Sequence, residues 1–232
     1  SHELRTPLAA IQTNAQVSLA DPEPSVAEQA RRLEVIERLT RRMGRLVADL
    51  LFLARQEVPA DQTVRVPCSL NDILQQVIEE QAPLARAAEL TLVHRPGPAA
   101  PLVADPDQIH RLFANLLSNA VRYTPAGGRV QVTLVREGRE AVVEVRDTGI
   151  GIAPEHLLHI FERFYRVDSA RSRSAGGSGL GLAIARAIAH NHSGEITCES
   201  EPGVGTVFRV RLPLKPAAEP RTPAPRPQPQ RG

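Results

Sequence analysis

The chain has 232 residues, of which 42% are hydrophobic and 3% aromatic, and a formal net charge of +2 at pH 7. This length and hydrophobic content predict two folded units with aliphatic cores, and so small a net charge argues against nucleic acid or an anionic membrane as the main partner. The two cysteines, Cys68 and Cys198, lack metal-ligand spacing and are expected to be small buried or partly buried hydrophobic residues in a reducing compartment. The most apolar run, residues 46–54, is too short to cross a membrane.

Two long helices are predicted at the N-terminal end. From residue 1 to about 19, apolar residues recur every three or four positions, with Pro7 in the second turn. Ser25 and Glu28 have the spacing of a capping box, which starts a second helix that runs to about Arg55 and carries a wide apolar stripe. We therefore predict an antiparallel helical hairpin over residues 1–56 that forms half of a dimeric four-helix bundle. A purely structural bundle is the alternative.

Residues 57–62 are interpreted as a linker, after which mixed helical and strand patterns predict a second domain over residues 63–212. Strands are expected at 63–67, 90–94, 102–104, 129–136, 140–146, 194–200 and 206–212, and helices at 69–88, 105–122 and 179–190. Residues 147–178 are too long, polar and Gly-rich for a simple connection and predict a functional loop with small helical pieces. The Pro-rich residues 213–232 are expected to be a disordered tail.

His2 is the candidate phosphoryl acceptor. His2 and Thr6 are four residues apart, so they share one helical face, and Glu3 flanks it. A neutral imidazole keeps one nitrogen lone pair free, and Glu3 can accept a hydrogen bond from the proton on the other nitrogen. The alternative is a solvent-facing His beside a Glu at the start of a helix.

A second group of candidate residues lies on the helix predicted at 105–122. Asn115 and Asn119 are four apart and project from the same face, and amide oxygens suit Mg²⁺. Arg122 and Tyr123 follow, offering a cation for phosphate and a flat ring for a base. Amides that only hydrogen-bond neighbouring helices are the alternative.

Two Gly-rich motifs follow. Asp147, Gly149 and Gly151 leave a predicted strand; the carboxylate can accept from an exocyclic amine, which favours adenine, and the glycines allow the backbone to approach a ring closely. Residues 176–181 precede a helix whose N-terminal amides are suited to bind phosphate, although the spacing is neither that of a Walker loop nor that of a dinucleotide fingerprint. Between them, residues 160–166 are rich in aromatics and Arg, as in a helix packed by two Phe or in a lid that brings cations to a polyphosphate.

Five motifs together resemble the sensor histidine kinases of two-component systems, over residues 1–212. Ser-His-Glu-Leu-Arg-Thr-Pro resembles the H box, Asn-Leu-Leu-Ser-Asn-Ala-Val-Arg-Tyr the N box and Asp-Thr-Gly-Ile-Gly-Ile the first Gly box. Phe-Glu-Arg-Phe-Tyr resembles the F box and Gly-Gly-Ser-Gly-Leu-Gly-Leu the second Gly box. The resemblance implies a dimeric helical hairpin that bears the phosphorylated His, followed by an ATP-binding α/β two-layer sandwich shared with gyrase and Hsp90-type ATPases.

The resemblance also implies a role for each matching residue. His2 would receive the γ-phosphoryl group of ATP, Glu3 would act as the base, and Thr6 would position a water for dephosphorylation of the partner. Asn119 would hold Mg²⁺, Asn115 would assist at the phosphates, and Asp147 would bind adenine near Tyr123. The lid around the phosphates would be shaped by Gly177, Gly179, Leu180 and Gly181. Arg122 stands where many relatives have Lys.

The resemblance further implies partners and a location. The chain is expected to form a homodimer through the hairpin and to pass the phosphoryl group to an aspartate of a response regulator receiver domain. It begins inside a predicted helix without an initiating Met, so we interpret it as the cytoplasmic catalytic part of a sensor kinase whose membrane anchor lies in a sensor region outside this chain. The alternatives are a nucleotide-binding scaffold, or an ATPase or serine kinase of the same fold that phosphorylates no histidine.

Overall fold

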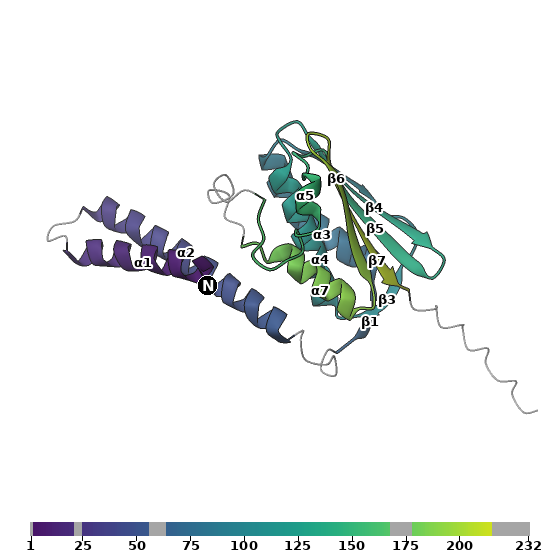
Figure 1. Cartoon of the computed structure of the whole chain (residues 1–232), viewed down its shortest axis with the longest axis horizontal. Helices are drawn as coiled ribbons and strands as arrows, with labels where there is room; N and C mark the ends of the chain where they lie inside the picture. The colour runs from purple at the N-terminus through teal and green to yellow at the C-terminus, as the bar shows by residue number, and fades with distance from the viewer. Residues whose placement is uncertain (1, 21–24, 56–63, 168–177, 215–232) are drawn as a thin grey trace, which may run out of the picture.

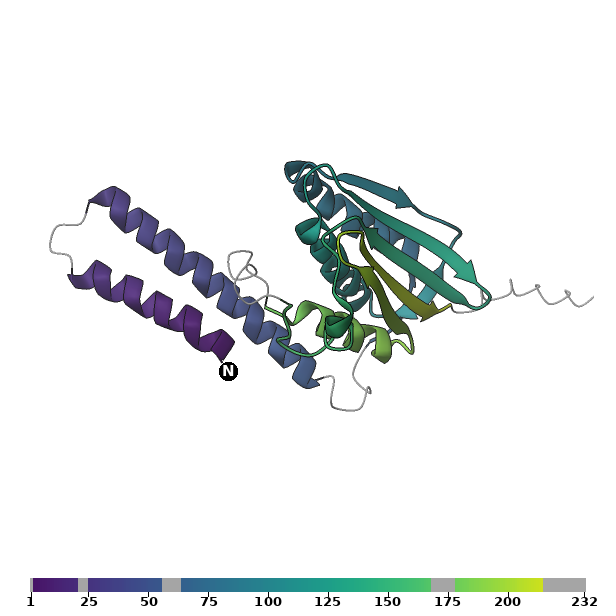
Figure 2. The ribbon, with the colours of Figure 1, turned by 45° about the horizontal axis from the view of Figure 1, so that its top comes forward.

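The computed structural model describes residues 2–20, 25–55, 64–167 and 178–214. Helices α1 (His2–Ala20) and α2 (Val26–Arg55) form the predicted antiparallel hairpin (Figures 1 and 2). Ser25 caps α2 as predicted, because its hydroxyl accepts from the Glu28 N–H at 3.3 Å and donates to the Glu28 carboxylate at 2.9 Å. In both views α1 begins beside the middle of α2, and α2 continues beyond it toward the second unit.

The second unit is the predicted two-layer sandwich. A five-stranded sheet in the order β2-β4-β5-β7-β6 is covered on one face by helices, and β1 pairs with β3 in a separate two-stranded sheet (Figure 1). All neighbouring strands are antiparallel except β2 and β4. The strands are β1 (Val66–Ser69), β2 (Thr91–Arg95), β3 (Pro101–Ala104), β4 (Arg129–Glu137), β5 (Glu140–Asp147), β6 (Glu195–Glu201) and β7 (Gly205–Pro213). The helices are α3 (Leu70–Ala87), α4 (Pro106–Tyr123), α5 (Pro154–Leu157) and α7 (Gly181–Asn191).

Apolar and polar side chains alternate along the strands, so one face of the sheet is apolar and covered by helices while the other face is polar. In β4, Val130 and Val132 are fully buried beneath the helices. On the other face, Arg209 of β7 bonds to Glu144 of β5 at 2.5 Å and also to Glu199 of β6. These carboxylates raise the pKa of Arg209. Arg209, Glu144 and Glu199 remain in contact with solvent, as expected for the uncovered face of a two-layer sandwich.

The first strand differs from its predicted range. β1 spans Val66–Ser69 rather than residues 63–67, because it pairs with β3 from Val66 opposite Ala104 to Ser69 opposite Pro101. Ser69 ends the strand and also caps α3, accepting from the Asp72 N–H at 3.3 Å. The linker predicted at residues 57–62 lies outside the described residues.

Residues 213 and 214, which were predicted to begin the disordered tail, belong to the folded domain, and residues 215–232 lie outside the described residues. β7 includes Pro213, and Leu214 is buried with its N–H bonded to the Arg139 carbonyl at 2.8 Å. The pairing of residues 213 and 214 with the start of β5 could not be predicted from the composition of the segment, which is dominated by Pro, Ala and Arg. Among the helices that the structure describes, none has the length and apolar character needed to cross a bilayer.

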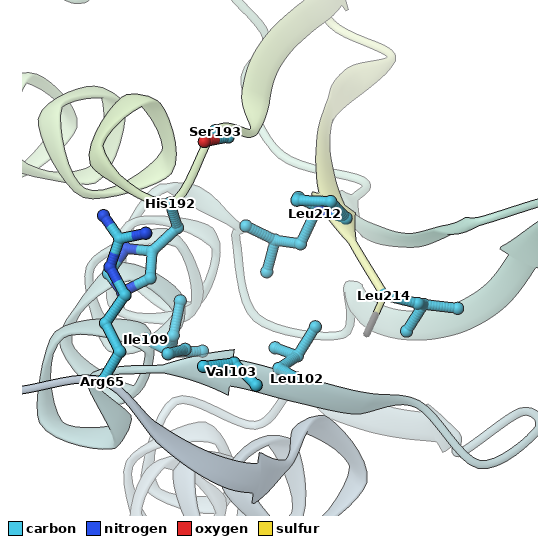
Figure 3. A pocket seen from close by; sticks show the side chains of 10 residues that line it. Arg65, Leu102, Val103, Ile109, His192, Ser193, Leu212 and Leu214 are labelled. Carbon is cyan, nitrogen blue, oxygen red and sulfur yellow. The ribbon is translucent and has the colours of Figure 1, made fainter. Parts of the chain in front are cut away.

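A cavity of about 270 Å³ lies where β3, β7 and the C-terminal end of α7 meet (Figure 3). Leu102, Leu212 and Leu214 form its apolar wall, and His192 and Arg65 lie together at one side. The His192 Nδ1 donates to the Ile188 carbonyl at 2.8 Å, and its Nε2 accepts from the N–H of Asp105, the N-cap residue of α4, at 3.1 Å. The bond from Asp105 requires an unprotonated Nε2 and therefore the neutral imidazole, and burial lowers the pKa of His192.

We predict that His192 makes the stability of the fold depend on pH. The unfolded chain takes up a proton below pH 6.5, the ordinary pKa of His, whereas the folded chain resists it. The contribution is therefore complete above pH 6.5 and is lost as the pH falls, by at most about 1.4 kcal/mol per pH unit. Urea unfolding of wild type and His192→Gln between pH 7.5 and 5 should show their free energies of unfolding converging toward low pH. His190→Gln, at an exposed position of the same helix, is the control; a difference for His192→Gln that stays constant with pH would contradict the prediction.

Candidate nucleotide-binding site

A cleft of about 560 Å³ opens between α2, α4, the N-terminal end of α7 and the ends of β5 and β7. It brings together residues of α4 with residues of both Gly motifs, which are far apart in the sequence. The predicted site residues that line it are Asn115, Asn119, Arg122, Tyr123, Asp147, Gly151, Gly179 and Gly181. The amide face of α4 is therefore open toward both glycine turns rather than sealed in the core.

Helix α4 has one buried face and one face toward the cleft. Asp105 caps the helix, and its Oδ1 accepts from the N–H groups of residues 107 and 108 at 3.1 Å. Leu112 and Leu116 are fully buried against the sheet side of the helix. Asn115 and Asn119 lie on another face, and because they are one turn apart both line the cleft. The predicted common face is present.

Asp147 is the last residue of β5 and is only 7% exposed. Its Oδ1 accepts from the Gly149 N–H at 2.8 Å and from the Thr206 N–H at 3.2 Å, which fixes the carboxyl group and leaves Oδ2 facing no partner in the described part of the chain. Burial raises the pKa of the Asp147 carboxyl, and the two backbone donors oppose this.

Gly149 is not among the residues that line the cleft but packs beside two that do, and its role in binding stays a prediction. The residue is buried, and a Cβ there would lie 2.6 Å from the Tyr123 carbonyl oxygen and 2.7 Å from Asp147 Oδ1. The missing side chain lets the turn pack on the end of α4, where the Ile150 N–H donates to the Tyr123 carbonyl at 3.1 Å. Gly151 does line the cleft, with a φ of 71° that favours glycine.

The second glycine turn, at Gly179, immediately precedes α7. Gly179 has a φ of 70°, and its carbonyl accepts from the Phe164 N–H at 2.9 Å. Within the described residues no side chain caps α7, and Gly181, where the helix begins, lines the cleft, so the first N–H groups of the helix lie at the cleft. Leu180 was predicted to bind the cofactor, but its side chain is fully buried and belongs to the core beneath α7. Gly177 lies outside the described residues.

Residues 160–166 do not form the helix that was one reading of their pattern. Phe161 packs edge-on against Phe208, with ring centroids 6.3 Å apart, and the Tyr165 hydroxyl bonds to His156 Nδ1 at 2.8 Å. Tyr165 and Arg166 line the cleft. These contacts agree with the lid reading, in which aromatics hold the segment and a cation reaches the cleft.

Several residues that line the cleft carry buried polar atoms that lack hydrogen-bond partners within the described structure. The buried side-chain nitrogens without a hydrogen bond include Nδ2 of Asn115, Nε and Nη2 of Arg122, Nη2 of Arg166 and Nε of Arg42, all from residues that line the cleft. Every one of these atoms is a donor. Because buried donors are rarely left unpaired, the cleft fits a ligand that supplies several acceptor oxygens and negative charge, as a polyphosphate does.

The proposed acceptor region lies on the other part of the molecule. His2 and Glu3 are in the first turn of α1, but their side chains are outside the described structure; Thr6 is exposed and does not line the cleft. Of these three residues, Thr6 is the one whose described side chain can be placed, and it lies away from the cleft. The described structure contains no group of three or more His, Cys, Asp or Glu residues able to hold a metal ion.

One wall of the cleft comes from α2 and was not predicted from the sequence. Arg42, Arg45, Leu46 and Asp49 line it. Their spacing over two turns places them on one side of a helix whose apolar stripe had been assigned to the hairpin and its dimer. The width of that stripe was the available signal, but it does not identify which surface covers it.

Comparison with known proteins gives two family matches. The model described as "His Kinase A (phospho-acceptor) domain" matches residues 1–59, and the one described as "Histidine kinase-, DNA gyrase B-, and HSP90-like ATPase" matches residues 104–216. The sensor histidine kinase RppB of Synechocystis sp. is 42% identical over 92% of this chain and 47% of its own length. The sensor-like histidine kinase SenX3 of Mycobacterium tuberculosis is 37% identical over 92% of this chain and 52% of its own. The chain thus spans about half the length of these curated relatives.

Solved structures agree with this assignment. Full-length ShkA in complex with AMPPNP superposes with a TM-score of 0.72 at 27% identity, covering 93% of this chain and 45% of ShkA. The mycobacterial sensor histidine kinase MprB covers 66% of this chain and all of its own, with a TM-score of 0.58 at 28% identity. With the phosphoacceptor and ATP-binding matches in order along one chain, and relatives of the same kind over nearly all of it, this protein belongs to the sensor histidine kinases of two-component systems.

Proposed function

We propose that this chain binds ATP with Mg²⁺ in the cleft, autophosphorylates on His2 and passes the phosphoryl group to an aspartate of a response regulator. The observation that carries the proposal is that several residues lining the cleft have buried donors without partners in the described part of the chain, while Asp147, a buried acceptor, lines the same cleft. A nucleoside polyphosphate has the matching polarity, with acceptor oxygens at its phosphates and a donor amine on adenine.

The residues of the cleft would divide the binding between them. Asp147 Oδ2 accepts from the exocyclic amine, and Tyr123 lies beside the base. Asn115, Arg122 and Arg166 donate to phosphate oxygens, and the first amides of α7 add the positive end of a helix dipole. This arrangement holds the polyphosphate by charge-assisted hydrogen bonds, which position it without any covalent step.

The amide oxygen of Asn119 fits a role in holding Mg²⁺ together with phosphate oxygens, because this ion prefers hard oxygen ligands and keeps several waters. When bound, the ion supplies neutralisation of the negative charge on the phosphate oxygens. Asn119 lines the cleft one turn after Asn115, so both amides face the same ligand.

At the acceptor, the free nitrogen lone pair of His2 attacks the γ-phosphorus, the bond from that phosphorus to the β,γ-bridging oxygen breaks, and ADP leaves with the electron pair. Glu3 accepts a hydrogen bond from the N–H of the other ring nitrogen and takes up that proton as the phosphohistidine forms. We propose that Thr6, one turn further along α1, positions a water for dephosphorylation of the regulator. The hairpin leaves large apolar side chains exposed on both helices, which supports a homodimer through this surface: Leu8, Val17, Leu33, Val47 and Leu51. We further propose that the chain is the cytoplasmic catalytic part of a sensor kinase.

Incubation of the chain with γ-labelled ATP and Mg²⁺ tests this function. We expect protein-bound label that is labile in acid and stable in base, and its transfer to an added receiver domain. In the same assay, Thr6→Ala should slow the loss of label from the regulator. Acid-stable label would instead indicate a hydroxyl-directed kinase, release of phosphate alone would indicate an ATPase, and binding without turnover would indicate a scaffold.

A further inference from the structure

The hairpin and the sandwich are joined by a polar contact beside the nucleotide cleft. Asp49 of α2 forms an ion pair with Arg111 of α4, and the Arg111 guanidinium also lies over the ring of Phe52, 4.4 Å from its centroid. The side chains of Asp49 and Arg111 are 24% and 32% exposed, so solvent screens this pair less than it screens a surface pair. The contact fixes one turn of α2 against α4.

Helix α4 shows which end of the cleft α2 covers. Its last residue, Tyr123, adjoins Asp147 through the Gly149 turn, so this is the end proposed for adenine. Asn115, two turns earlier and about 12 Å away along the axis, lies beside Gly181 at the start of α7. Arg111 is one further turn back. α2 is therefore docked at the end of the cleft where the phosphates would lie.

Arg42 lies on the same side of α2 as Asp49, two turns earlier, and lines the cleft. Its Nε is buried and has no hydrogen-bond partner among the described residues, like side-chain nitrogens of Asn115, Arg122 and Arg166, which line the same cleft. The neighbouring Arg41 contrasts with it, since that side chain is 75% exposed and pairs with Glu37 along the helix. The two adjacent arginines thus face different surroundings.

We propose that Arg42 binds a phosphate oxygen of the nucleotide, so that the phosphoacceptor hairpin itself forms part of the nucleotide site. This inference rests on the proposed function, and it adds a binding residue from outside the ATP-binding domain. A bound polyphosphate then bridges α2 to α4 and α7 and reinforces the contact made by Asp49 and Arg111. By linkage, nucleotide binding stabilises the docked arrangement of the two parts, and docking raises nucleotide affinity by the same factor.

Calorimetric titration of the full chain with Mg²⁺ and a non-hydrolysable ATP analogue tests the role of Arg42. Arg42→Gln should weaken binding of the analogue roughly tenfold, the loss expected for a charge-assisted hydrogen bond. Its affinity for AMP should change much less, and Arg42→Lys should recover part of the loss by keeping the charge. Arg41→Gln removes the same charge from the exposed neighbour and should bind as wild type does. Thermal unfolding of each variant establishes that the fold is intact.

Hydrogen exchange of residues 42–49 supplies a second readout. The analogue should slow exchange there in wild type and less in Arg42→Gln. Equal affinity of Arg42→Gln and wild type for the analogue, or an equal loss for AMP, would overturn the role of Arg42 and leave the proposed function standing. A wild-type chain that binds no nucleotide would instead overturn the proposed function, and this inference with it.

Discussion

His2→Gln is expected to abolish acid-labile labelling from γ-labelled ATP. Gln keeps a side chain of similar length and polarity, but its amide nitrogen has no lone pair available for attack on phosphorus, because that pair is delocalised into the carbonyl group. The rate should therefore fall to background rather than by a modest factor. Phosphoprotein recovered after base treatment, with and without prior exposure to acid, measures this loss.

Nucleotide affinity separates loss of the acceptor from loss of the site. His2→Gln should bind the ATP analogue as tightly as wild type, because α1 contributes no residue to the lining of the cleft in the described structure. His190→Gln, an exposed histidine near the end of α7, is the matched control and should label normally. Acid-labile label that persists in His2→Gln would place the acceptor elsewhere.

Asp147→Asn is expected to weaken ATP binding by about 3 kcal/mol, or roughly a hundredfold. The Asn oxygen can keep the hydrogen bonds from Gly149 and Thr206, but its amide group then points a donor at the donor amine of adenine. A buried unpaired donor is costly, so affinity falls although the turn remains in place. Titration with the ATP analogue gives the loss, and a melting temperature near that of wild type shows that the fold is kept.

The comparison of ATP with GTP sharpens this prediction. Wild type should prefer ATP, because the Asp147 carboxylate accepts from an amine that guanine replaces by a carbonyl, and Asp147→Asn should lose much of that preference. Asp107→Asn makes the same chemical change at an exposed position in the first turn of α4 and should leave both affinities unchanged. Unaltered selectivity in Asp147→Asn would remove Asp147 from the base-reading role.

The sequence predicted the fold and most of the cleft because both depend on local patterns. The capping box at Ser25 predicted where the second helix begins, and that cap is present in the structure. The helices predicted from residues 69 and 105 are likewise preceded by caps, at Ser69 and Asp105. The four-residue spacing of Asn115 and Asn119 was enough to place both amides on one face, whatever the rest of the chain did. The glycine-containing motif that begins at Asp147 likewise predicted a turn at the end of a strand, because glycine allows tight turns.

What local patterns did not reveal was how distant segments pack. Leu180 stands among glycines and was grouped with the loop, yet its burial depends on how α7 lies on the core. Gly149 was assigned to the ligand, and the sequence did not show that its missing side chain also accommodates the backbone at Tyr123. The α2 wall of the cleft depends on a contact between two folded units, and an apolar stripe does not specify its partner.

The two faces of α4 have a consequence for mutational tolerance. Leu112 and Leu116 are buried in the core, while Asn115 and Asn119 line the cleft. Neighbouring residues of this helix therefore contribute to stability and to binding. In a saturation screen for signalling output, both sets would score as losses with nearly the same severity. Only abundance measured alongside output would separate them, since truncating the leucines should deplete the protein from the cell and altering the asparagines should leave it plentiful but silent.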